Sequence, residues 1–313
     1  MSRAATLAQL ESTIPAELLQ RVTGAYLGLA VGDALGATVE FMTPREIQHE
    51  YGRHDAIRGG GWLKLKRGQV TDDTTMALAL GEAILQQGSV DAVAIAKSFH
   101  EWLKQKPVDI GNTVRRGIVH FRYSGIPVVP ANEQDAGNGA CMRCLPIALF
   151  TYGQTTARMK AASKRQAHVT HNNEWSDAAC ECVIEMIQAA CNGEDKAQLL
   201  KGPVASLIKR FPQFAFRARR SENPSPFIVE TMHSVMQAFF DTDNFESCLI
   251  DVVNRGGDAD TTGAIAGMIA GSYYGLAAIP KKWLQALDND IYTRCESQAM
   301  ALIELALQRT EPV

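Results

Sequence analysis

The sequence lacks an excess of positive charge, a secretion signal and an alternating strand pattern. Its 313 residues contain 31 lysines and arginines against 34 aspartates and glutamates, which gives a net charge of −3 and a pI near 6.2. No basic stripe is present, so we do not expect nucleic-acid binding. Residues 1–20 carry acidic residues and a proline in place of an apolar core, which argues against a signal peptide.

A long hydrophobic run is also missing. The most apolar stretch, 263–279, spans about 17 residues and is short for a membrane span. Within it, Gly263, Gly267 and Gly271 recur at four-residue spacing. Glycines at this spacing let two helices approach closely, so the stretch predicts a buried central helix rather than a membrane segment.

The cysteines form no disulfide framework. There are seven, an odd number without regular spacing, which favours reduced thiols and a cytoplasmic protein. The pair Cys141 and Cys144 is a lone CxxC with no second pair and no well-spaced histidine. This arrangement is more typical of core thiols than of a zinc or redox site.

The dominant period along the chain is helical. Apolar residues recur at helical spacing over 16–35, 73–87, 90–104, 142–152, 176–191, 226–240, 245–253, 261–276 and 292–308. No low-complexity linker divides the chain, so we predict one compact all-α domain. The loops expected to form the walls of a site are 54–70, 105–113, 123–141 and 212–226.

Two short acidic clusters are the most informative part of the sequence. The first is Thr71-Asp72-Asp73 and the second is Asp258-Ala-Asp260-Thr261, and each precedes an apolar helical pattern. Carboxylate and hydroxyl oxygens suit hard cations such as Mg²⁺ or Mn²⁺ better than zinc. Four carboxylates brought together without cations would repel one another. The clusters therefore predict a metal-assisted enzyme.

Helix capping is the alternative interpretation of these clusters. Aspartate and threonine at a helix start are ordinary N-caps, and the helix dipole favours carboxylates there. For either cluster alone, capping is the better interpretation. A cap uses only one such side chain, however, so two doubled clusters are harder to explain in this way.

An ordered set of motifs resembles the ADP-ribosylglycohydrolases, specifically their dinitrogenase reductase-activating branch. The set covers most of residues 22–280 and consists of GAYLGLA at 24–30, GDALGATVEF at 32–41, GGGW at 59–62, QVTDDT at 69–74, DIGNT at 109–113, AGNGACMR at 136–143 and NRGGDADTTG at 254–263. Some motifs are weak alone, but their order is specific. Residues 1–20 and those after about 290 carry none of the resemblance, so we expect an N-terminal extension over 1–20 and the family domain over 21–313.

The resemblance implies a multi-helix, all-α fold with two Mg²⁺ or Mn²⁺ ions in a cleft. By motif, Thr71, Asp72 and Asp73 would bind one side of the metal pair, and Asp258, Asp260 and Thr261 the other. The implied reaction cleaves the N-glycosidic bond that joins ADP-ribose to a protein side chain, in this branch chiefly arginine. The modified protein is thereby restored.

Two further carboxylates have matching motifs and would act on the substrate. Asp109 is the candidate for acid–base or ring-opening chemistry, and Glu40 for orienting water or gating the site. The alternatives are a loop-turn residue for Asp109 and a residue supporting the metal ligands for Glu40. Trp62 would pack against a base or a guanidinium, or anchor its loop.

The expected substrate contacts lie on two loops and at a pair of histidines. Gly137, Asn138 and Gly139 form a turn that can present backbone N–H groups to a pyrophosphate, and Asn112 can bind ribose hydroxyls. His168 and His171, three residues apart, are candidates for facing the cleft, with a structural role as the alternative for both.

The expected partner is an ADP-ribosylated protein, such as nitrogenase reductase or the target of a toxin. An alternative is an immunity or regulatory protein that neutralises an ADP-ribosylating toxin or transferase by hydrolysis, by blocking it, or by both. Residues 1–20 are the segment that could serve such blocking. A non-catalytic ADP-ribose-binding module would not need six oxygen ligands.

Overall fold

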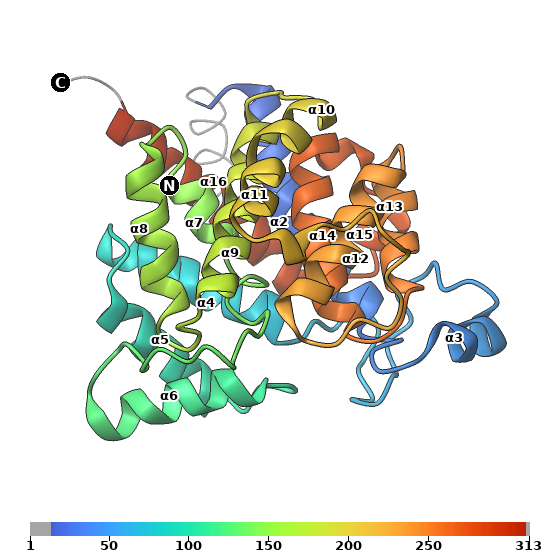
Figure 1. Cartoon of the computed structure of the whole chain (residues 1–313), viewed down its shortest axis with the longest axis horizontal. Helices are drawn as coiled ribbons and strands as arrows, with labels where there is room; N and C mark the ends of the chain where they lie inside the picture. The colour runs from blue at the N-terminus through green and yellow to red at the C-terminus, as the bar shows by residue number, and fades with distance from the viewer. Residues whose placement is uncertain (1–13, 311–313) are drawn as a thin grey trace.

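Two glycine-rich helices make the most extensive contact in the fold. In the computed structural model, which describes residues 14–310, α2 (Ala16–Gly36) and α14 (Ala259–Tyr274) cross the centre (Figure 1). A Cβ atom built on Gly28 would lie 2.2 Å from the carbonyl oxygen of Gly267, and one on Gly32 would lie 2.0 Å from that of Gly263. Only glycine permits this approach, and the prediction of a buried central helix is confirmed.

The remaining helices surround this pair. Figure 1 shows α12 and α13 on one side of it and α7, α8 and α9 on the other. Their bounds are α3 (Pro44–Tyr51), α4 (Asp72–Gln87), α5 (Ala92–Lys104), α6 (Asn112–Ser124), α7 (Leu145–Phe150), α8 (Thr156–Ala167), α9 (Glu174–Cys191), α10 (Lys196–Leu199), α11 (Ala205–Arg210), α12 (Ile228–Asp241), α13 (Phe245–Val253), α15 (Lys281–Leu284) and α16 (Asn289–Thr310). Residues 14–310 contain only isolated β-bridges besides helices and turns. The all-α, single-domain prediction is confirmed.

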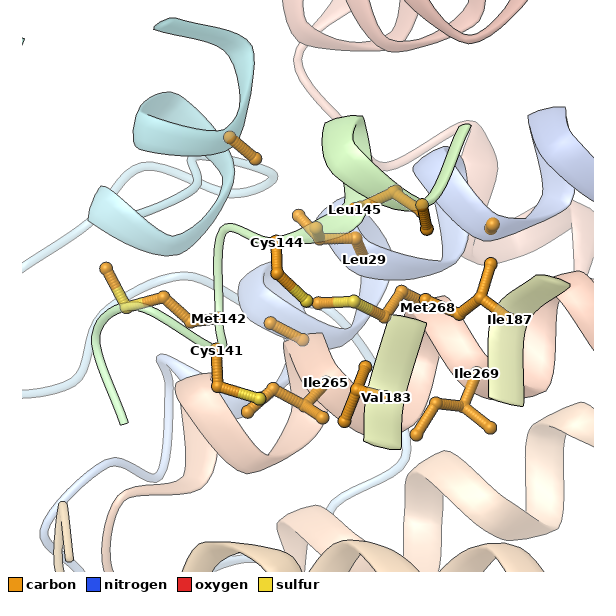
Figure 2. Packing of buried hydrophobic residues seen from close by; sticks show 14 of the residues in the cluster. Leu29, Cys141, Met142, Cys144, Leu145, Val183, Ile187, Ile265, Met268 and Ile269 are labelled. Atoms are coloured by element: carbon orange, nitrogen blue, oxygen red, sulfur yellow. The ribbon is translucent and has the colours of Figure 1, made fainter. Parts of the chain in front are cut away.

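The core is filled by side chains from helices that are distant in sequence. Figure 2 shows Leu29 of α2 beside Met268 of α14, with Ile187 of α9 and the segment that leads into α7 closing the cluster. Cys141 and Cys144 lie in this core, and all seven cysteines are free and buried. The CxxC pair therefore supplies packing, as expected.

Some helices were missing from the sequence-based prediction. The three longest of these are α3, α6 and α8, whose exposed faces are polar. On α6, for example, the buried residues are Val114, Gly117 and Ile118 alone. These residues recur at helical spacing on an otherwise polar helix, so a periodic signal was present and the sequence-based prediction overlooked it. Residues 1–13 of the expected N-terminal extension lie outside the described range, and Ala16 already begins α2. No helix within 14–310 is sufficiently long and apolar to cross a membrane.

Candidate functional site

The N-termini of α4 and α14 meet at the floor of an open cleft. Asp72 is the first residue of α4, and Asp258 is the N-cap of α14. The cleft has a volume of about 540 Å³. The residues from the sequence-based prediction that line it are Glu40, Trp62, Asp72, Asp109, Asn112, Gly137, Asn138, Gly139, His171, Asp258, Asp260 and Thr261.

Backbone hydrogen bonds tie the cleft walls to one another. The amide of Gly257 donates to the carbonyl of Met42 (2.9 Å), and its own carbonyl accepts from the amide of Phe41 (2.7 Å). The amide of Asn138 donates to the carbonyl of Pro226 (3.0 Å). The cleft is therefore built from segments that lie far apart along the chain and are joined by these hydrogen bonds.

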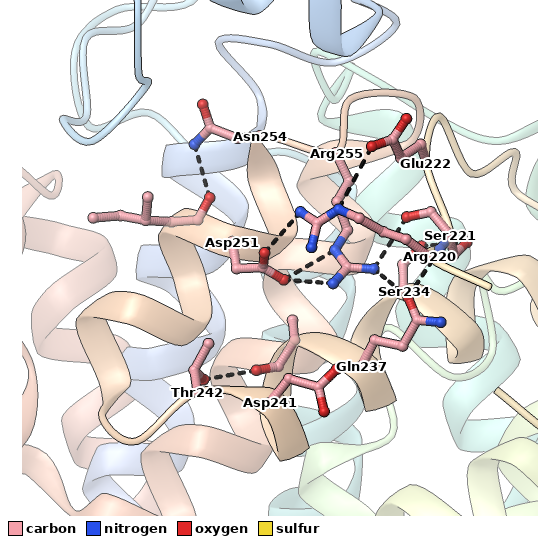
Figure 3. Close-up of polar contacts among 12 residues, drawn as sticks. Arg220, Ser221, Glu222, Ser234, Gln237, Asp241, Thr242, Asp251, Asn254 and Arg255 are labelled. Atoms are coloured by element: carbon pink, nitrogen blue, oxygen red, sulfur yellow. Dashed lines mark hydrogen bonds and ion pairs between the residues drawn. The ribbon is translucent and has the colours of Figure 1, made fainter. Parts of the chain in front are cut away.

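A buried arginine anchors the segment that precedes α14. Figure 3 shows Arg255 and Asp251, whose Oδ2 accepts from Nε and Nη2 of the guanidinium at 3.0 and 2.6 Å. Nη1 donates to the carbonyl of Ser221 (3.0 Å) and to the side chain of Gln237. Burial lowers the pKa of Arg255 and Asp251 opposes that change. This network fixes the backbone that leads to Asp258.

Asp33, in the last turn of α2, holds the first acidic cluster in place. It is fully buried, and its carboxylate accepts hydrogen bonds from the backbone amides and the hydroxyls of Thr71 and Thr74. Sequence reasoning missed this residue. A signal was available, because residues 22–36 are otherwise almost wholly apolar and a charge in such a run needs buried partners.

The first cluster divides between the cleft and the layer behind it. Asp72 faces the cleft, and its Oδ2 accepts from the amide of Gly111 (3.4 Å). Thr71 and Asp73 do not line the cleft; the Thr71 hydroxyl lies 3.0 Å from Asp33 Oδ1 and 3.0 Å from Asp73 Oδ2. The other oxygen of Asp73 is buried without a hydrogen-bond partner. An ionised carboxylate oxygen in that position would need a cation beside it; without a cation the carboxyl group would be protonated.

Glu40, Asp109 and Asp260 converge from three separate segments. One carboxylate oxygen from each lies within 4.8 Å of the others, a spacing that could hold a metal ion. The indole N–H of Trp62 donates to Glu40 Oε2 at 2.7 Å. Trp62 is half exposed and its ring centroid lies 5.4 Å from that of Phe41, so this aromatic pair flanks the acidic centre.

Burial and mutual repulsion raise the pKa values of these carboxyl groups. The pKa of Glu40 rises to about 8, mainly through burial, with Asp258, Asp109 and Asp72 adding to the effect. Burial likewise raises the pKa of Asp72 to about 7 and that of Asp258 to about 6. The pKa of Asp260 is raised well above its usual value by burial and by Glu40. Without a positive charge, the cluster resists full ionisation.

The donor set fits divalent cations. Within residues 14–310, no lysine or arginine forms an ion pair with Asp33, Glu40, Asp72, Asp73, Asp109, Asp258 or Asp260. The donors are oxygens, and one of them is a buried atom without a partner. Hard cations prefer such ligands.

A glycine turn forms another wall of the cleft. The side-chain amide of Asn138 donates to Asp258 and to Thr231, which couples the turn to the second acidic cluster. A Cβ atom on Gly139 would lie 2.8 Å from Cε1 of His171, so the imidazole and the turn are in direct contact. The side chain and the backbone amide of Asn138 are therefore both engaged by the protein, so a ligand would meet the turn at Gly137 and Gly139.

The structure places the two candidate histidines differently. His171 lines the cleft, whereas His168 does not. Nε2 of His168 lies 2.9 Å from Asp177 Oδ2, at the start of α9, away from the site. His168 ends α8 as its C-cap, so the two histidines do not share a helix face. The substrate contact expected at His168 is instead available at His171.

A larger groove, of about 680 Å³, runs between α4, α5 and the start of α16. Among its acidic residues, Glu101 pairs with Lys104 (2.7 Å) and Asp290 with Arg294 (3.6 Å) at the surface. Exposed pairs of this kind are ordinary solvated charges. The converging carboxylates lie in the smaller cleft, which is the candidate functional site.

The fold and the cleft together define an all-α protein with an oxygen-donor centre between two helix N-termini. Sequence comparison then identifies the family. The pattern of the ADP-ribosylglycohydrolase family matches residues 14–312, and the chain belongs to this family.

Two relatives and one solved structure show how similar the chain is to known members. It is 48% identical to the ADP-ribosyl-[dinitrogen reductase] glycohydrolase of Rhodospirillum rubrum over 91% of this chain and 96% of the relative. It is 32% identical to the ADP-ribosylarginine hydrolase Tri1 of Pseudomonas putida strain GB-1, covering 91% and 77%. A solved structure of an ADP-ribosylglycohydrolase-related protein complex superposes with a TM-score of 0.83 and 32% identity over 93% of this chain and 100% of that chain.

Proposed function

We propose that the protein is a metal-dependent hydrolase that removes ADP-ribose from modified arginine side chains of proteins. The observation that carries this proposal is the cluster of buried carboxylates without cationic partners at the floor of a cleft. The names of the Rhodospirillum and Pseudomonas relatives specify ADP-ribosylated dinitrogen reductase and ADP-ribosylarginine as substrates. The cleft has room for a ligand of the size of ADP-ribose.

Two Mg²⁺ or Mn²⁺ ions are the proposed cofactors. Asp72, Asp73 and Thr71 would hold them on the α4 side, and Asp258, Asp260 and Thr261 on the α14 side. When bound, the cations would neutralise the clustered carboxylates and supply Lewis acidity to the oxygens of the sugar and of water. Asp33 would keep Thr71 and Thr74 in position, because its carboxylate accepts hydrogen bonds from the amide and the hydroxyl of each.

Asp109 is the proposed acid–base group. Its carboxyl lies in the cleft wall, and burial raises its pKa against the lowering effects of the Ile110 amide and Arg115. A raised pKa favours the protonated form, which can donate a proton to the departing nitrogen as the glycosidic bond breaks. The same group, once ionised, can stabilise positive charge at the anomeric carbon or accept a proton from water.

Glu40 is the proposed water-orienting or gating group. The Trp62 indole N–H fixes one of its oxygens, and one carboxylate oxygen of Glu40 lies within 4.8 Å of oxygens of Asp109 and Asp260. A planar, cationic guanidinium leaving group would find carboxylates and an aromatic face at this end of the cleft. These features support arginine as the modified residue.

The opposite part of the cleft is the proposed site for the rest of ADP-ribose. Gly137 and Gly139 line this part of the cleft and would meet the pyrophosphate with their backbone, and Asn112 would bind ribose hydroxyls. The imidazole of His171 contacts the glycine turn and lines the same wall. Phe227 lines the same wall and packs against Trp175, which offers an aromatic face for the adenine. The free thiols support a cytoplasmic location for such an enzyme.

A release assay on defined substrates tests this function. Proteins that carry ADP-ribose on arginine, on serine or on glutamate would be incubated side by side with the enzyme in Mg²⁺ or Mn²⁺. We expect arginine-linked ADP-ribose to be released much faster than the other two. Faster release from serine would refute the arginine assignment while leaving the family standing, and release from none would refute hydrolysis.

A further inference from the structure

The imidazole of His171 is held on its Nδ1 side by a chain of hydrogen bonds through Thr170 and Arg143, and this chain does not include the residues of the acidic centre. His171 is buried, and its Nδ1 lies 2.8 Å from the hydroxyl oxygen of Thr170. Its other ring nitrogen, Nε2, faces the glycine turn: a Cβ atom on Gly137 would lie 3.1 Å from it. No hydrogen bond to this nitrogen comes from any of residues 14–310, although His171 lines the cleft.

The next member of the chain is a fully buried arginine. Arg143 donates from Nη2 to the Thr170 hydroxyl oxygen at 2.7 Å and to the carbonyl of Gln166 at 3.1 Å. Its Nε donates to the side chain of Gln166 at 3.1 Å, and its guanidinium carbon lies 4.5 Å from the centre of the Phe99 ring. These contacts fix the guanidinium of Arg143 in the orientation from which it donates a hydrogen bond to the Thr170 hydroxyl.

The donor and acceptor roles along the chain follow from the chemistry of each group. A guanidinium only donates, so the Thr170 oxygen accepts from Arg143 and keeps its own proton for another partner. The remaining partner that the structure gives to this hydroxyl is Nδ1 of His171. If Nδ1 accepts that proton, a neutral imidazole carries its hydrogen on Nε2.

The reverse arrangement leaves a buried donor unsatisfied. If Nδ1 carried the hydrogen and donated to Thr170, the threonine hydroxyl would have no acceptor in a buried position, which is costly. Protonation of both nitrogens is also disfavoured. Burial, together with the positive charges of Arg143 and Arg116, lowers the pKa of His171 to about 3.

We propose that Arg143 and Thr170 are positioning residues that fix His171 as a neutral hydrogen-bond donor, with its Nε2–H presented to an acceptor oxygen of ADP-ribose. The tautomer rests on the hydrogen bonds alone, whereas the identity of the acceptor rests on the proposed function. The acceptor is a phosphate or ribose oxygen, because these are the acceptors that a ligand seated against the glycine turn would bring to this wall. A neutral donor here adds no charge to a cleft dominated by carboxylates.

Nitrogen NMR of the full-length protein tests the tautomer directly. In a ¹⁵N-histidine sample, the signals missing from the His171→Gln variant identify His171. We expect a pyridine-like Nδ1 and a pyrrole-like Nε2, unchanged between about pH 5 and pH 8. A pyrrole-like Nδ1, or an imidazolium pattern within this range, would overturn the proposal. This measurement requires neither metal nor substrate.

Binding of free ADP-ribose, measured by calorimetry in Mg²⁺, tests the positioning role. Thr170→Val keeps the shape of the side chain and removes the hydroxyl, so we expect binding about 3- to 10-fold weaker, the effect of one lost hydrogen bond. Thr170→Ser should restore the affinity and the tautomer signals. The matched control is Thr151→Val. This removes another buried threonine hydroxyl, which accepts from Gln188 at 3.0 Å, donates to the Ile147 carbonyl at 2.7 Å and does not line the cleft.

The outcomes separate this inference from the proposed function. Equal ADP-ribose affinity in Thr170→Val, Thr151→Val and the wild type would refute the positioning role, even if the enzyme hydrolyses its substrate normally. A wild-type protein that does not bind ADP-ribose would refute the proposed function and with it the acceptor assigned to His171. The NMR result would still decide the tautomer, including when Thr170→Val fails to fold.

Discussion

Gly28→Ala should separate the two central helices and destabilise the protein. The added Cβ would lie 2.2 Å from the carbonyl oxygen of Gly267 and 3.2 Å from the ring of Phe245. An unstrained carbon–oxygen contact needs about 1 Å more than the first distance. Because the obstructing atom belongs to the backbone of a buried helix, α14 itself must move rather than a flexible side chain.

The size of the effect follows from two opposing terms. Overpacking a rigid core costs about 3 kcal/mol or somewhat more at a backbone contact. Alanine is favoured over glycine in a helix by about 1 kcal/mol. The net loss is therefore about 2–3 kcal/mol, which for a domain of this size lowers the melting temperature by about 3–5 °C. Thermal and urea unfolding, each followed by circular dichroism, would measure it.

A second glycine provides the control for this experiment. Gly202 lies in a helical segment, its φ is not positive, and a Cβ built on it meets no atom within 4 Å. Gly202→Ala should therefore cost much less stability than Gly28→Ala, and what it costs comes from the new Cβ meeting the ring of Pro203, the next residue in the chain. If Gly28→Ala were as stable as the wild type under the same conditions, the close approach of α2 and α14 would not be an essential feature of the fold.

Three further predictions concern the acidic centre. Chelation should lower the melting temperature of the wild type, and added Mn²⁺ should restore it. At a Mn²⁺ concentration a hundred times the dissociation constant, binding should add about 3 kcal/mol to the free energy of unfolding. The melting temperature of Asp258→Asn should respond to neither treatment. Asp109→Ala should keep its metal response and ADP-ribose affinity but lose about 10²- to 10⁴-fold in turnover; normal turnover would remove Asp109 from the mechanism. In chelator, the free energy of unfolding should fall as the pH rises from about 4 to 7, because folding raises the pKa of Asp72 to about 7 and of Asp258 to about 6 from 3.8, so the folded state holds more protons than the unfolded one in this window. Stability that increased with pH there would contradict the buried, unpaired state of these groups.

The helical class of the protein was open to prediction from the sequence, because its apolar residues recur at helical spacing and that recurrence is local. The glycine spacing at 263, 267 and 271 likewise predicted a helix in close contact with another. The partner's identity was not local information. Gly24, Gly28 and Gly32 of α2 meet these glycines only because the two helices run antiparallel in the folded chain.

The two acidic clusters were visible in the sequence, but the direction of each side chain was not. Adjacent residues at a helix N-terminus point in different directions, so Asp72 reaches the cleft while Asp73 lies behind it. Asp33 was missed because its role depends on hydrogen bonds to threonines about forty positions away. The metal-ligand assignment of these residues stays a prediction.

The histidines show most clearly where sequence reasoning ends. A spacing of three residues places two side chains on one face only while the helix continues, and α8 ends at Ala167. Beyond that point the turn directs His168 to Asp177 and His171 to the glycine turn. The sequence by itself determined the all-α class, the helices of the core, the acidic clusters and the family, because these depend on local pattern and motif order. The tertiary structure alone decided which polar groups share the cleft, because that depends on contacts between segments distant in the chain.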